Sequence, residues 1–324
     1  MNRRRYLKIL STALILSQFG EANADSKVKN IGFLIPNSGY EDEWLGLIKK
    51  LESLGWVQGK NLNIIYKYVL NDYSKIQSLA TELVHEGVNV IVIATTTVIL
   101  EVMKLVKDIP IVGVGMIEPV SSQVIENISH PEGNVTGTSY LLDNVSLKLL
   151  ETVRWMQPKS TQVATLINSG GKLREYLFDL FQKATPTFGF EYTNYFASNP
   201  LEIEEAFKSM SKKRIQSAII LQNPLYASQR FQIAELGIKY NIATYAQWDK
   251  LAKAGMLTSY GNDIFDAYEN AAGYVDKILK GTPVSKLPLY ESSVFKRVIN
   301  LKTAKKLGIK ITKEMQLRTD RLIK

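Results

Sequence analysis

The strongest constraint on the fold is an alternation of short apolar segments with helical segments that runs along the chain twice. The first run ends near residues 133–140 (GNVTGTSY), and a second run with the same plan begins soon afterwards. Within the first run, residues 88–94 are so uniformly apolar that both faces of the predicted strand should be buried, as in a parallel sheet. The alternation predicts an α/β protein with two doubly wound parallel-sheet lobes, and we expect residues 133–140 to contain the first crossing between them.

Hydrophobic periodicity and turn residues place the individual elements. Strands are predicted at residues 30–35, 62–69, 88–94, 111–114, 162–167, 190–196, 217–221, 242–245, 256–260 and 290–300. Helices are predicted at residues 41–54, 72–86, 98–107, 121–125, 146–155, 173–184, 200–210, 229–240, 249–254, 264–280 and 301–307. We expect a second crossing at residues 259–262, which returns the helix at 264–280 to the first lobe.

A chain of 324 residues exceeds what one hydrophobic core usually covers, so two domains are expected. We assign residues 28–138 and about 260–285 to the first lobe, and residues 139–259 to the second. Residues 286–324 are assigned to the second lobe, with the first lobe as the alternative, because the sequence does not show which lobe they join. The ligand cleft is expected between the two lobes.

Residues 1–24 have the pattern of a secretory signal peptide. Residues 3–5 are arginines, residues 6–16 are mainly apolar, and Ala22 and Ala24 fit the positions that signal peptidase reads. The apolar part is shorter than the ~20 residues needed to span a bilayer, which argues against a membrane anchor. The sequence has no cysteine, which excludes a disulfide, a thiolate nucleophile and a cysteine-linked lipid. We therefore expect a freely diffusing periplasmic protein.

The net charge of +9 does not by itself indicate a nucleic-acid partner. Residues 1–24 contain four of the 40 basic and one of the 31 acidic residues, so the remainder carries a net charge of +6. Basic residues are interspersed with acidic ones, for example at residues 49–52 and 202–214, whereas nucleic-acid binding requires a clustered patch. The pattern is typical of a solvated protein surface, and no nucleic-acid partner is expected.

Polar and aromatic residues gather where predicted strands end. In open parallel sheets, ligands bind just beyond the carboxyl ends of the strands, where helix N-termini favour anions. The candidate ligand-binding residues there are Ser38, Thr96, Thr97, Glu118, Ser139, Tyr140, Asn168, Asn223, Tyr226, Gln247, Asp249, Tyr260, Asn262 and Asp263. Some have structural alternatives, since Ser38 and Thr97 could cap helices and Tyr226 could belong to a core. Hydroxyls, amides and aromatic rings indicate binding of a small molecule.

The sequence offers little for catalysis. His85 and His130 are the only histidines, and they fall in a predicted helix end and a loop. The G-x-S-x-G, H-E-x-x-H and G-x-G-x-x-G motifs are absent, and no cluster of metal ligands is present. We expect no enzymatic activity, no cofactor and no metal.

Seven segments, from IGFLIP at residue 31 to VINLKTAKKLGI at residue 298, resemble one protein family. The others are LGWVQGKNLNIIYKY, LATELVHEGVNVIVIATTT, IPIVGVGMIEPV, PEGNVTGTS and GMLTSYG. In this order they are similar to ABC-transporter substrate-binding proteins, which include tryptophan and tyrosine binders. The resemblance implies a type I periplasmic binding protein fold with a three-strand hinge, and a monomer whose closed form delivers ligand to an ABC permease and its ATPase.

The chain departs from the family at three places in the predicted cleft, so the ligand is less well indicated than the fold. Glu118 precedes Pro119 where many relatives have Asp-Pro, residues 259–263 read SYGND instead of SYGPD, and residues 167–169 read INS instead of WNP.

We hypothesise that the ligand is an aromatic or similar amino acid, held when hinges near residues 137–138 and 259–261 close. Its carboxylate would be bound by Ser38, Thr96 and Thr97, its ammonium by Asp249, Glu118 or Asp263, and its side chain by Tyr226, Tyr260 or Tyr140. The alternatives are a receptor module that feeds a membrane signalling protein, and a secreted α/β hydrolase.

Overall fold

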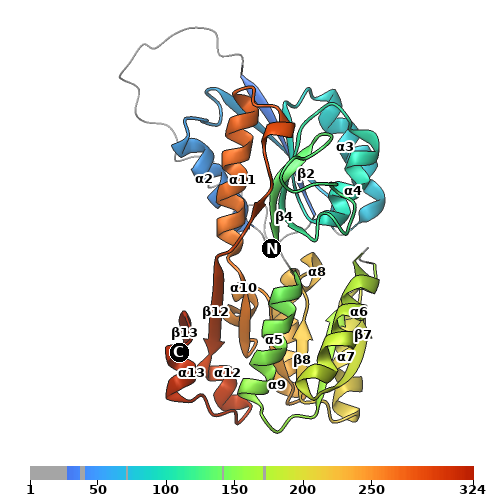
Figure 1. The fold of residues 1–324 in the computed structure, drawn as a ribbon, viewed down its shortest axis with the longest axis vertical. Coiled ribbons are helices and arrows are strands. Elements are labelled where there is room, and N and C mark those ends of the chain that lie inside the picture. The colour runs from blue at the N-terminus through green and yellow to red at the C-terminus, as the bar shows by residue number, and fades with distance from the viewer. Residues whose placement is uncertain (1–27, 37–40, 71, 141, 171–172) are drawn as a thin grey trace.

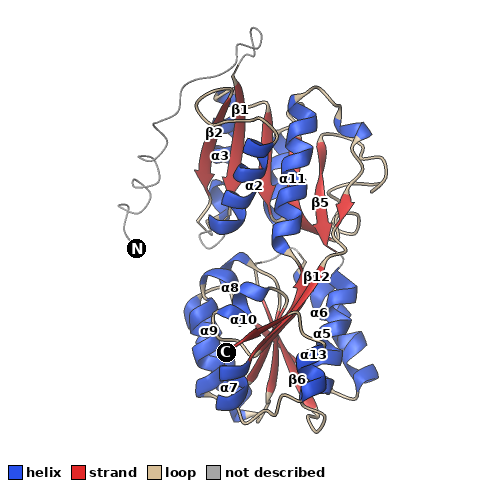
Figure 2. Ribbon diagram, turned by 90° about the vertical axis from the view of Figure 1, so that its left-hand side faces the viewer, coloured by secondary structure: helices blue, strands red, loops and turns tan. Residues whose placement is uncertain are grey.

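The computed structural model describes residues 28–36, 41–70, 72–140, 142–170 and 173–324, which form two α/β lobes stacked along the long axis of the molecule (Figure 1). Each lobe is built on one sheet with helices on both faces (Figure 2). The two-lobed α/β architecture with predominantly parallel sheets confirms the fold class predicted from the alternation of strands and helices.

Lobe 1 contains a six-stranded sheet in the order β11-β5-β4-β3-β1-β2, with all neighbours parallel. Its strands are β1 (Lys29–Ile35), β2 (Leu62–Tyr68), β3 (Val90–Ala94), β4 (Ile111–Ile117), β5 (Val135–Tyr140) and β11 (Tyr290–Glu291). Its helices are α2 (Glu41–Ser53), η1 (Tyr73–Lys75), α3 (Ile76–His85), α4 (Thr96–Leu105), α11 (Ile264–Leu279) and η3 (Val284–Lys286).

Burial on both faces of this sheet explains the apolar runs in its strands. Successive side chains of a strand point to opposite faces. Phe33 packs in the cluster that contains residues of α2 and α11, whereas its neighbour Leu34 packs in the cluster that contains residues of α3 and α4, and both are fully buried. Because neither face of the inner strands meets water, β3 and β4 consist of nonpolar residues along their whole length, whereas the edge strand β2 includes exposed polar residues.

Lobe 2 contains a seven-stranded sheet in the order β13-β12-β10-β9-β8-β6-β7, parallel except between β10 and β12. Its strands are β6 (Gln162–Ile167), β7 (Glu191–Phe196), β8 (Ser217–Ile220), β9 (Ala243–Ala246), β10 (Thr258–Asn262), β12 (Phe295–Asn300) and β13 (Arg321–Ile323). Its helices are α5 (Leu142–Met156), α6 (Arg174–Ala184), η2 (Thr185–Phe188), α7 (Pro200–Lys212), α8 (Pro224–Ser228), α9 (Arg230–Lys239), α10 (Asp249–Lys253), α12 (Leu301–Lys306) and α13 (Lys313–Leu317).

The chain passes between the lobes at three places. β5 of lobe 1 leads to α5 of lobe 2, β10 of lobe 2 leads through Asp263 to α11 of lobe 1, and β11 of lobe 1 leads to β12 of lobe 2. The single strand predicted at 290–300 is therefore two strands, separated at residues 292–294 where the chain changes sheets. The C-terminal residues 295–324 lie in lobe 2, which the sequence left open.

Two local features differ from, or refine, the sequence prediction. The helix predicted at residues 121–125 is a turn, because Gln123 has a φ of 62° and the amides of Val124 and Ile125 both donate to the Pro119 carbonyl. A left-handed residue cannot continue a helix.

In β5, Gly137 has a φ of 134°, and a Cβ there would lie 2.0 Å from the Gly113 carbonyl oxygen of β4. Only glycine permits this close approach beside the first crossing.

Candidate functional site in the interlobe cleft

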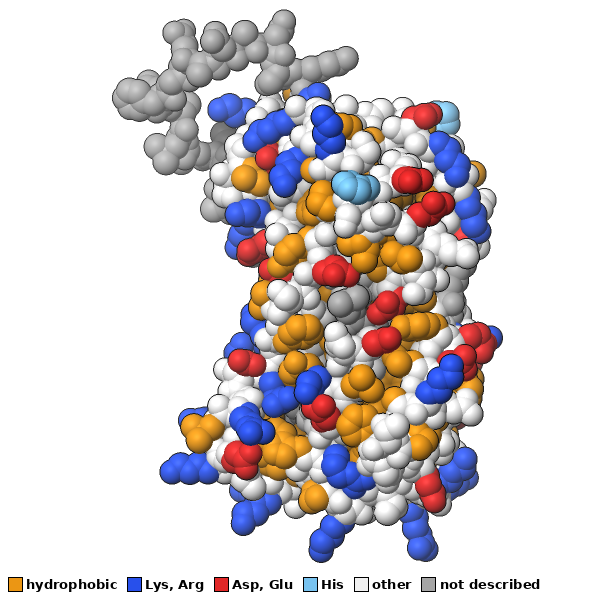
Figure 3. Space-filling view, viewed as in Figure 1, with side chains coloured by type: hydrophobic (Ala, Val, Ile, Leu, Met, Phe, Trp, Pro, Cys, Tyr) orange, Lys and Arg blue, Asp and Glu red, His pale blue; other side chains and the backbone are white. Residues whose placement is uncertain are grey.

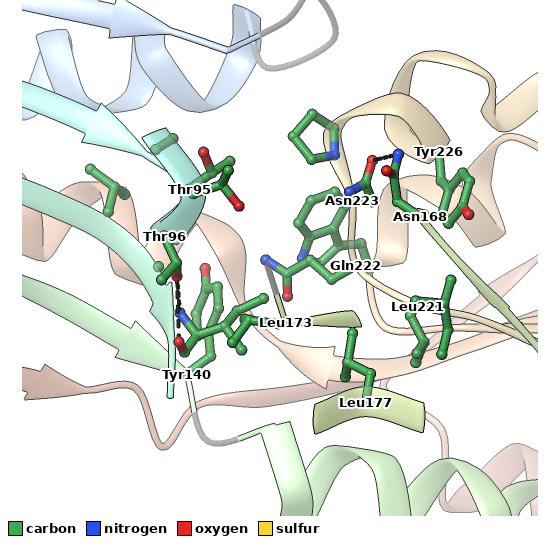
Figure 4. Close-up of a pocket in the computed structure, with 18 of the residues that line it drawn as sticks. Thr95, Thr96, Tyr140, Asn168, Leu173, Leu177, Leu221, Gln222, Asn223 and Tyr226 are labelled. Atoms are coloured by element: carbon green, nitrogen blue, oxygen red, sulfur yellow. Dashed lines mark hydrogen bonds between the residues drawn. The ribbon is translucent and has the colours of Figure 1, made fainter. Parts of the chain in front are cut away.

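A cleft with about 850 Å³ of empty space, open solvent included, lies between the lobes. Its lobe 1 wall comes from the carboxyl ends of β3, β4 and β5, from the N-terminus of α4, and from η1 and α11. Its lobe 2 wall comes from the carboxyl end of β6, from α6, and from the segments after β8 and β9 (Figure 4). These segments follow the carboxyl ends of parallel strands, where a ligand site was expected.

The N-terminus of α4 forms one polar part of the lobe 1 wall. Thr96 is buried, and its Oγ1 accepts a hydrogen bond from the amide of Ile117 at 2.9 Å, which ties this turn to the end of β4. Thr96 and Thr97 begin α4, so their amides have no acceptor within the helix and favour an anion. The preceding Thr95 has a φ of 105°, and its buried Oγ1 has no hydrogen-bond partner among the described residues. Such strain in a non-glycine residue often marks a binding site.

Tyr140 contributes a buried hydrogen-bond donor to the same wall. Its side chain is 3% exposed, and its ring lies against Gly115, where a Cβ would be 2.6 Å from the ring. Burial raises the pKa of Tyr140 well above its usual value, and the charges of Asp263, Asp266 and Glu43 raise it further. The phenol is therefore protonated, yet its oxygen has no hydrogen-bond partner in the described part of the chain. A ligand acceptor would satisfy it.

Side-chain amides dominate the polar part of the lobe 2 wall. Asn168 donates from Nδ2 to Oδ1 of Asn223 at 3.2 Å, and the same oxygen of Asn223 caps α8 by accepting from the Leu225 amide at 2.9 Å. Gln222 is held through its backbone amide, which donates to Oε1 of Gln247 at 2.8 Å. Its carboxamide reaches from this wall toward Thr96 and Tyr140 (Figure 4). Amides can donate and accept, so this wall can bind either kind of polar group.

The remaining lining is mainly aromatic and aliphatic. The aromatic members are Tyr73, Tyr140, Tyr226, Trp248 and Tyr268, and the larger aliphatic ones are Val114, Ile117, Ile167, Leu173, Leu177, Leu221 and Ile264. Arg174 is the charged residue of the lining, and its Nη1 donates to the Ser169 carbonyl at 3.3 Å. Within the described residues, no Asp or Glu lines the cleft. The arrangement suits a small ligand with an apolar or aromatic part.

An ion pair joins the two lobes near the cleft. Nζ of Lys250 in α10 donates to both carboxylate oxygens of Glu43 in α2, at 3.1 and 3.0 Å. The Glu43 side chain is 2% exposed and that of Lys250 is 20% exposed. Burial raises the pKa of Glu43, and the charge of Lys250 opposes this effect without cancelling it. The contact exists only while the lobes are close together.

A family model described as ABC transporter substrate binding protein matches residues 30–323. The chain belongs to this family. A curated relative of the family, the tyrosine-binding protein of Clostridioides difficile (strain R20291), is 25% identical over 286 residues, which cover 87% of this chain and 82% of the relative.

Solved structures of substrate-binding proteins share the fold. An ABC domain from Streptococcus pneumoniae in complex with L-Trp has a TM-score of 0.85 at 20% identity, and the match covers 92% of this chain and 100% of that one. The ligand-free, open structure of a substrate-binding protein with adhesive properties from Clostridium difficile has a TM-score of 0.67 at 22% identity, with 91% and 99% covered. These similarities agree with the type I periplasmic binding protein-like fold.

The candidate residues of this substrate-binding protein divide into two groups. Those that line the cleft are Thr96, Thr97, Tyr140, Asn168, Asn223 and Tyr226. Those that do not are Glu118, Ser139, Gln247, Asp249, Tyr260, Asn262 and Asp263, and Ser38 lies outside the described residues. Among the lining group, Tyr226 is fully buried and its hydroxyl donates to the Ala197 carbonyl at 2.9 Å, so only its ring faces the cleft.

Several residues that do not line the cleft serve the crossings and the packing around it. Asp263 caps α11 through the Phe265 amide at 3.2 Å and pairs with Lys296. Asn262 donates from Nδ2 to the Ser292 carbonyl at 2.7 Å, which joins the second crossing to the third. Contacts of this kind between distant segments explain why these polar side chains follow strand ends without facing the cleft.

Other members of this group are engaged within lobe 2, lie buried beside the crossing, or flank the cleft. Asp249 pairs with Lys253 inside α10, and Tyr260 is stacked on Phe295 at 5.8 Å between ring centroids. Ser139 is fully buried in β5. Glu118 has a φ of 45° and directly follows Ile117, which lines the cleft.

Apart from Thr95 and Trp248, which are next to the candidates Thr96 and Asp249, sequence reasoning missed four polar or aromatic lining residues of the substrate-binding protein: Gln222, Arg174, Tyr73 and Tyr268. Gln222 could have been found, because it lies between the buried strand β8 and the Asn223-Pro224 turn. The others sit on η1, α6 and α11, and their orientation depends on how the helices pack.

In the described residues, no cluster of three or more His, Asp or Glu side chains is arranged to bind a metal, and none of the helices has the length and apolarity to cross a bilayer.

Proposed function

We propose that this substrate-binding protein is the periplasmic receptor of an ABC importer and that it binds an aromatic amino acid in the interlobe cleft. The observation that carries the proposal is the placement of five aromatic side chains in a cleft that also contains the N-terminus of α4. The naming of one relative as tyrosine-binding and the L-Trp complex of another support this ligand class.

In the proposed pose, the carboxylate lies at the N-terminus of α4, bound by the amides and hydroxyls of Thr96 and Thr97. The helix dipole stabilises an anion there. Of the three acids expected to pair with the ammonium, Asp249 and Asp263 pair with lysines, and none of the three lines the cleft. We therefore assign the ammonium to carboxamide oxygens of the lobe 2 wall, such as that of Gln222. The ligand side chain packs against the aromatic rings of the cleft, where its burial contributes most of the affinity.

Binding draws the lobes together by rotation at the three crossings, a hinge motion in which a few residues at element ends change φ and ψ. The closed form is the one that the membrane permease and its ATPase recognise. The protein acts as a monomer, without catalytic turnover and without a cofactor.

A thermal-shift series on refolded protein tests both the receptor role and the pose. A ligand present at 100 times its Kd adds about 2.7 kcal/mol to the free energy of unfolding. We expect tyrosine, tryptophan or phenylalanine to raise the Tm. Tyramine and tryptamine, which lack the carboxylate, should not raise it, and Thr97→Val should weaken the response more than Thr81→Val on the surface of α3. If none of the three amino acids raised the Tm, or if the amines raised it by the same amount, the assignment would be contradicted.

A further inference from the structure

The basic residues are interspersed with acidic ones through most of the chain, but residues 301–324 are an exception. This stretch contains eight Lys or Arg residues and two acidic ones, so it supplies six of the nine net positive charges of the whole chain. The eight are Lys302, Lys305, Lys306, Lys310, Lys313, Arg318, Arg321 and Lys324, and we call the surface that they form the basic end.

The structure brings these charges to one side of lobe 2. α12, α13 and β13 lie close together on this side, at the left and lower left of lobe 2 in Figure 1, where Figure 3 shows Lys and Arg side chains projecting from the surface. All eight side chains are exposed. Of the two acids, Glu314 pairs with Arg318 inside the basic end at 3.5 Å, and Asp320 accepts from the Arg297 amide at 2.7 Å. No ion pair in the described chain involves the six lysines.

An exposed leucine lies within the basic end. Leu317, the last residue of α13, is 81% exposed and is followed by Arg318. It has the largest exposed fraction of any large apolar side chain in the described residues. An exposed leucine in a basic segment matches the surfaces that lie on membranes, where the cations meet lipid headgroups and the apolar side chain enters the interface.

The chemistry of the stretch favours a bilayer over a nucleic acid. Residues 301–324 contain no aromatic residue, whereas proteins that bind single strands use aromatic rings to stack on bases. A nucleic acid also offers no apolar phase for Leu317. Clusters of four to eight Lys or Arg residues are typical of sites that bind anionic lipid headgroups.

We propose that the basic end binds the surface of an anionic phospholipid bilayer, with Leu317 entering the interface. The basic end contains none of the residues that line the cleft, so the surface and the cleft can be occupied at the same time. Bound in this way, the receptor searches for its membrane partner in two dimensions. The proposal does not depend on which ligand the cleft takes.

Vesicle flotation tests the proposal, using protein expressed with its own leader and recovered after export. Vesicles of phosphatidylcholine with phosphatidylglycerol should bind the protein, pure phosphatidylcholine should not, and added salt should weaken the binding. Each lysine near an anionic surface strengthens binding about fivefold, so the triple change Lys305→Gln, Lys306→Gln and Lys310→Gln should weaken it roughly 100-fold. The matched control is Lys49→Gln, Lys50→Gln and Lys60→Gln, three exposed lysines of lobe 1.

A second pair of variants tests the apolar contact. Leu317→Ser should weaken vesicle binding about tenfold, whereas Leu201→Ser, which replaces a leucine that is 74% exposed on α7, should leave it unchanged. Equal binding to both kinds of vesicle, or equal losses from the two lysine triples, would overturn the proposal. So would a DNA duplex that displaces the protein from vesicles at equal phosphate concentration.

Discussion

The ion pair between Glu43 and Lys250 should favour the closed arrangement of the lobes, and Lys250→Met tests this role. The change removes the partner of a carboxylate that is 2% exposed and keeps most of the side-chain volume. Leaving a buried charge unpaired costs about 3–5 kcal/mol when the site cannot change. Here the lobes can separate, which lets water reach the Glu43 carboxylate. Lys250 is itself 20% exposed, so the ion pair is already partly solvated and the cost of losing it is smaller.

We expect the closed form to lose about 2 kcal/mol relative to the open form, which weakens ligand binding about 30-fold. Titration calorimetry with the aromatic amino acid that raises the Tm measures this change directly. Small-angle X-ray scattering without ligand should show a larger radius of gyration for the variant, because its lobes spend more time apart.

The matched control is Lys253→Met on the same helix. Lys253 pairs with Asp249 within α10, so its loss removes an ion pair of similar type that does not connect the lobes. A partly exposed pair of this kind contributes about 0.2–1 kcal/mol, and the affinity should change less than about fivefold. If Lys250→Met and Lys253→Met had the same Kd and the same scattering profile, the interlobe pair would have no role in closure.

Three further changes have defined outcomes. Tyr140→Phe removes a buried hydroxyl that has no partner among the described residues, so it should stabilise the ligand-free protein by about 1 kcal/mol. It should also reduce the ligand-induced rise in Tm, and an unchanged rise would exclude a contact between this hydroxyl and the ligand. Gly137→Ala, at a φ of 134° and facing a backbone oxygen, should destabilise by more than about 3 kcal/mol in urea unfolding, against about 1 kcal/mol for Gly59→Ala, which meets open space. The raised pKa of Glu43 means that the folded protein holds this proton more tightly than the unfolded chain does. Stability should therefore fall as pH rises from about 4.5 through the raised pKa, and Glu43→Gln should remove that fall in Tm measured against pH.

The fold could be predicted from the sequence because the burial of an element determines where its apolar residues occur. β6 has the predicted bounds, and α2 ends one residue before the predicted helix. In α2 the buried residues recur at the helical period, in β6 every residue but the first is buried, and turn residues follow closely in both cases. The prediction was wrong at residues 121–125 and 290–300, where the backbone changes direction within a stretch that was predicted as a single element.

The location of the cleft could also be predicted, since it follows from the topology of parallel sheets. The residues that line it could be predicted only in part. Asp263 and Tyr260 follow strand ends as ligand-binding residues do, but their partners Lys296 and Phe295 come from the third crossing, more than 30 residues further along the chain. Gln222 and Arg174 enter the lining through packing that no local pattern records.

The three crossings also determine when the lobes can fold during synthesis. α11 covers the face of the first sheet that carries α2, and Trp56 of the first lobe donates from Nε1 to Oδ1 of Asp276 at 2.8 Å, across 220 residues of sequence. Until α11 has left the ribosome, Trp44 and Leu47 on α2 lack the surface against which they pack in the native structure. The N-terminal lobe is therefore completed only after nearly the whole chain has been made, and such long-range closure favours slow folding and prolonged exposure to chaperones.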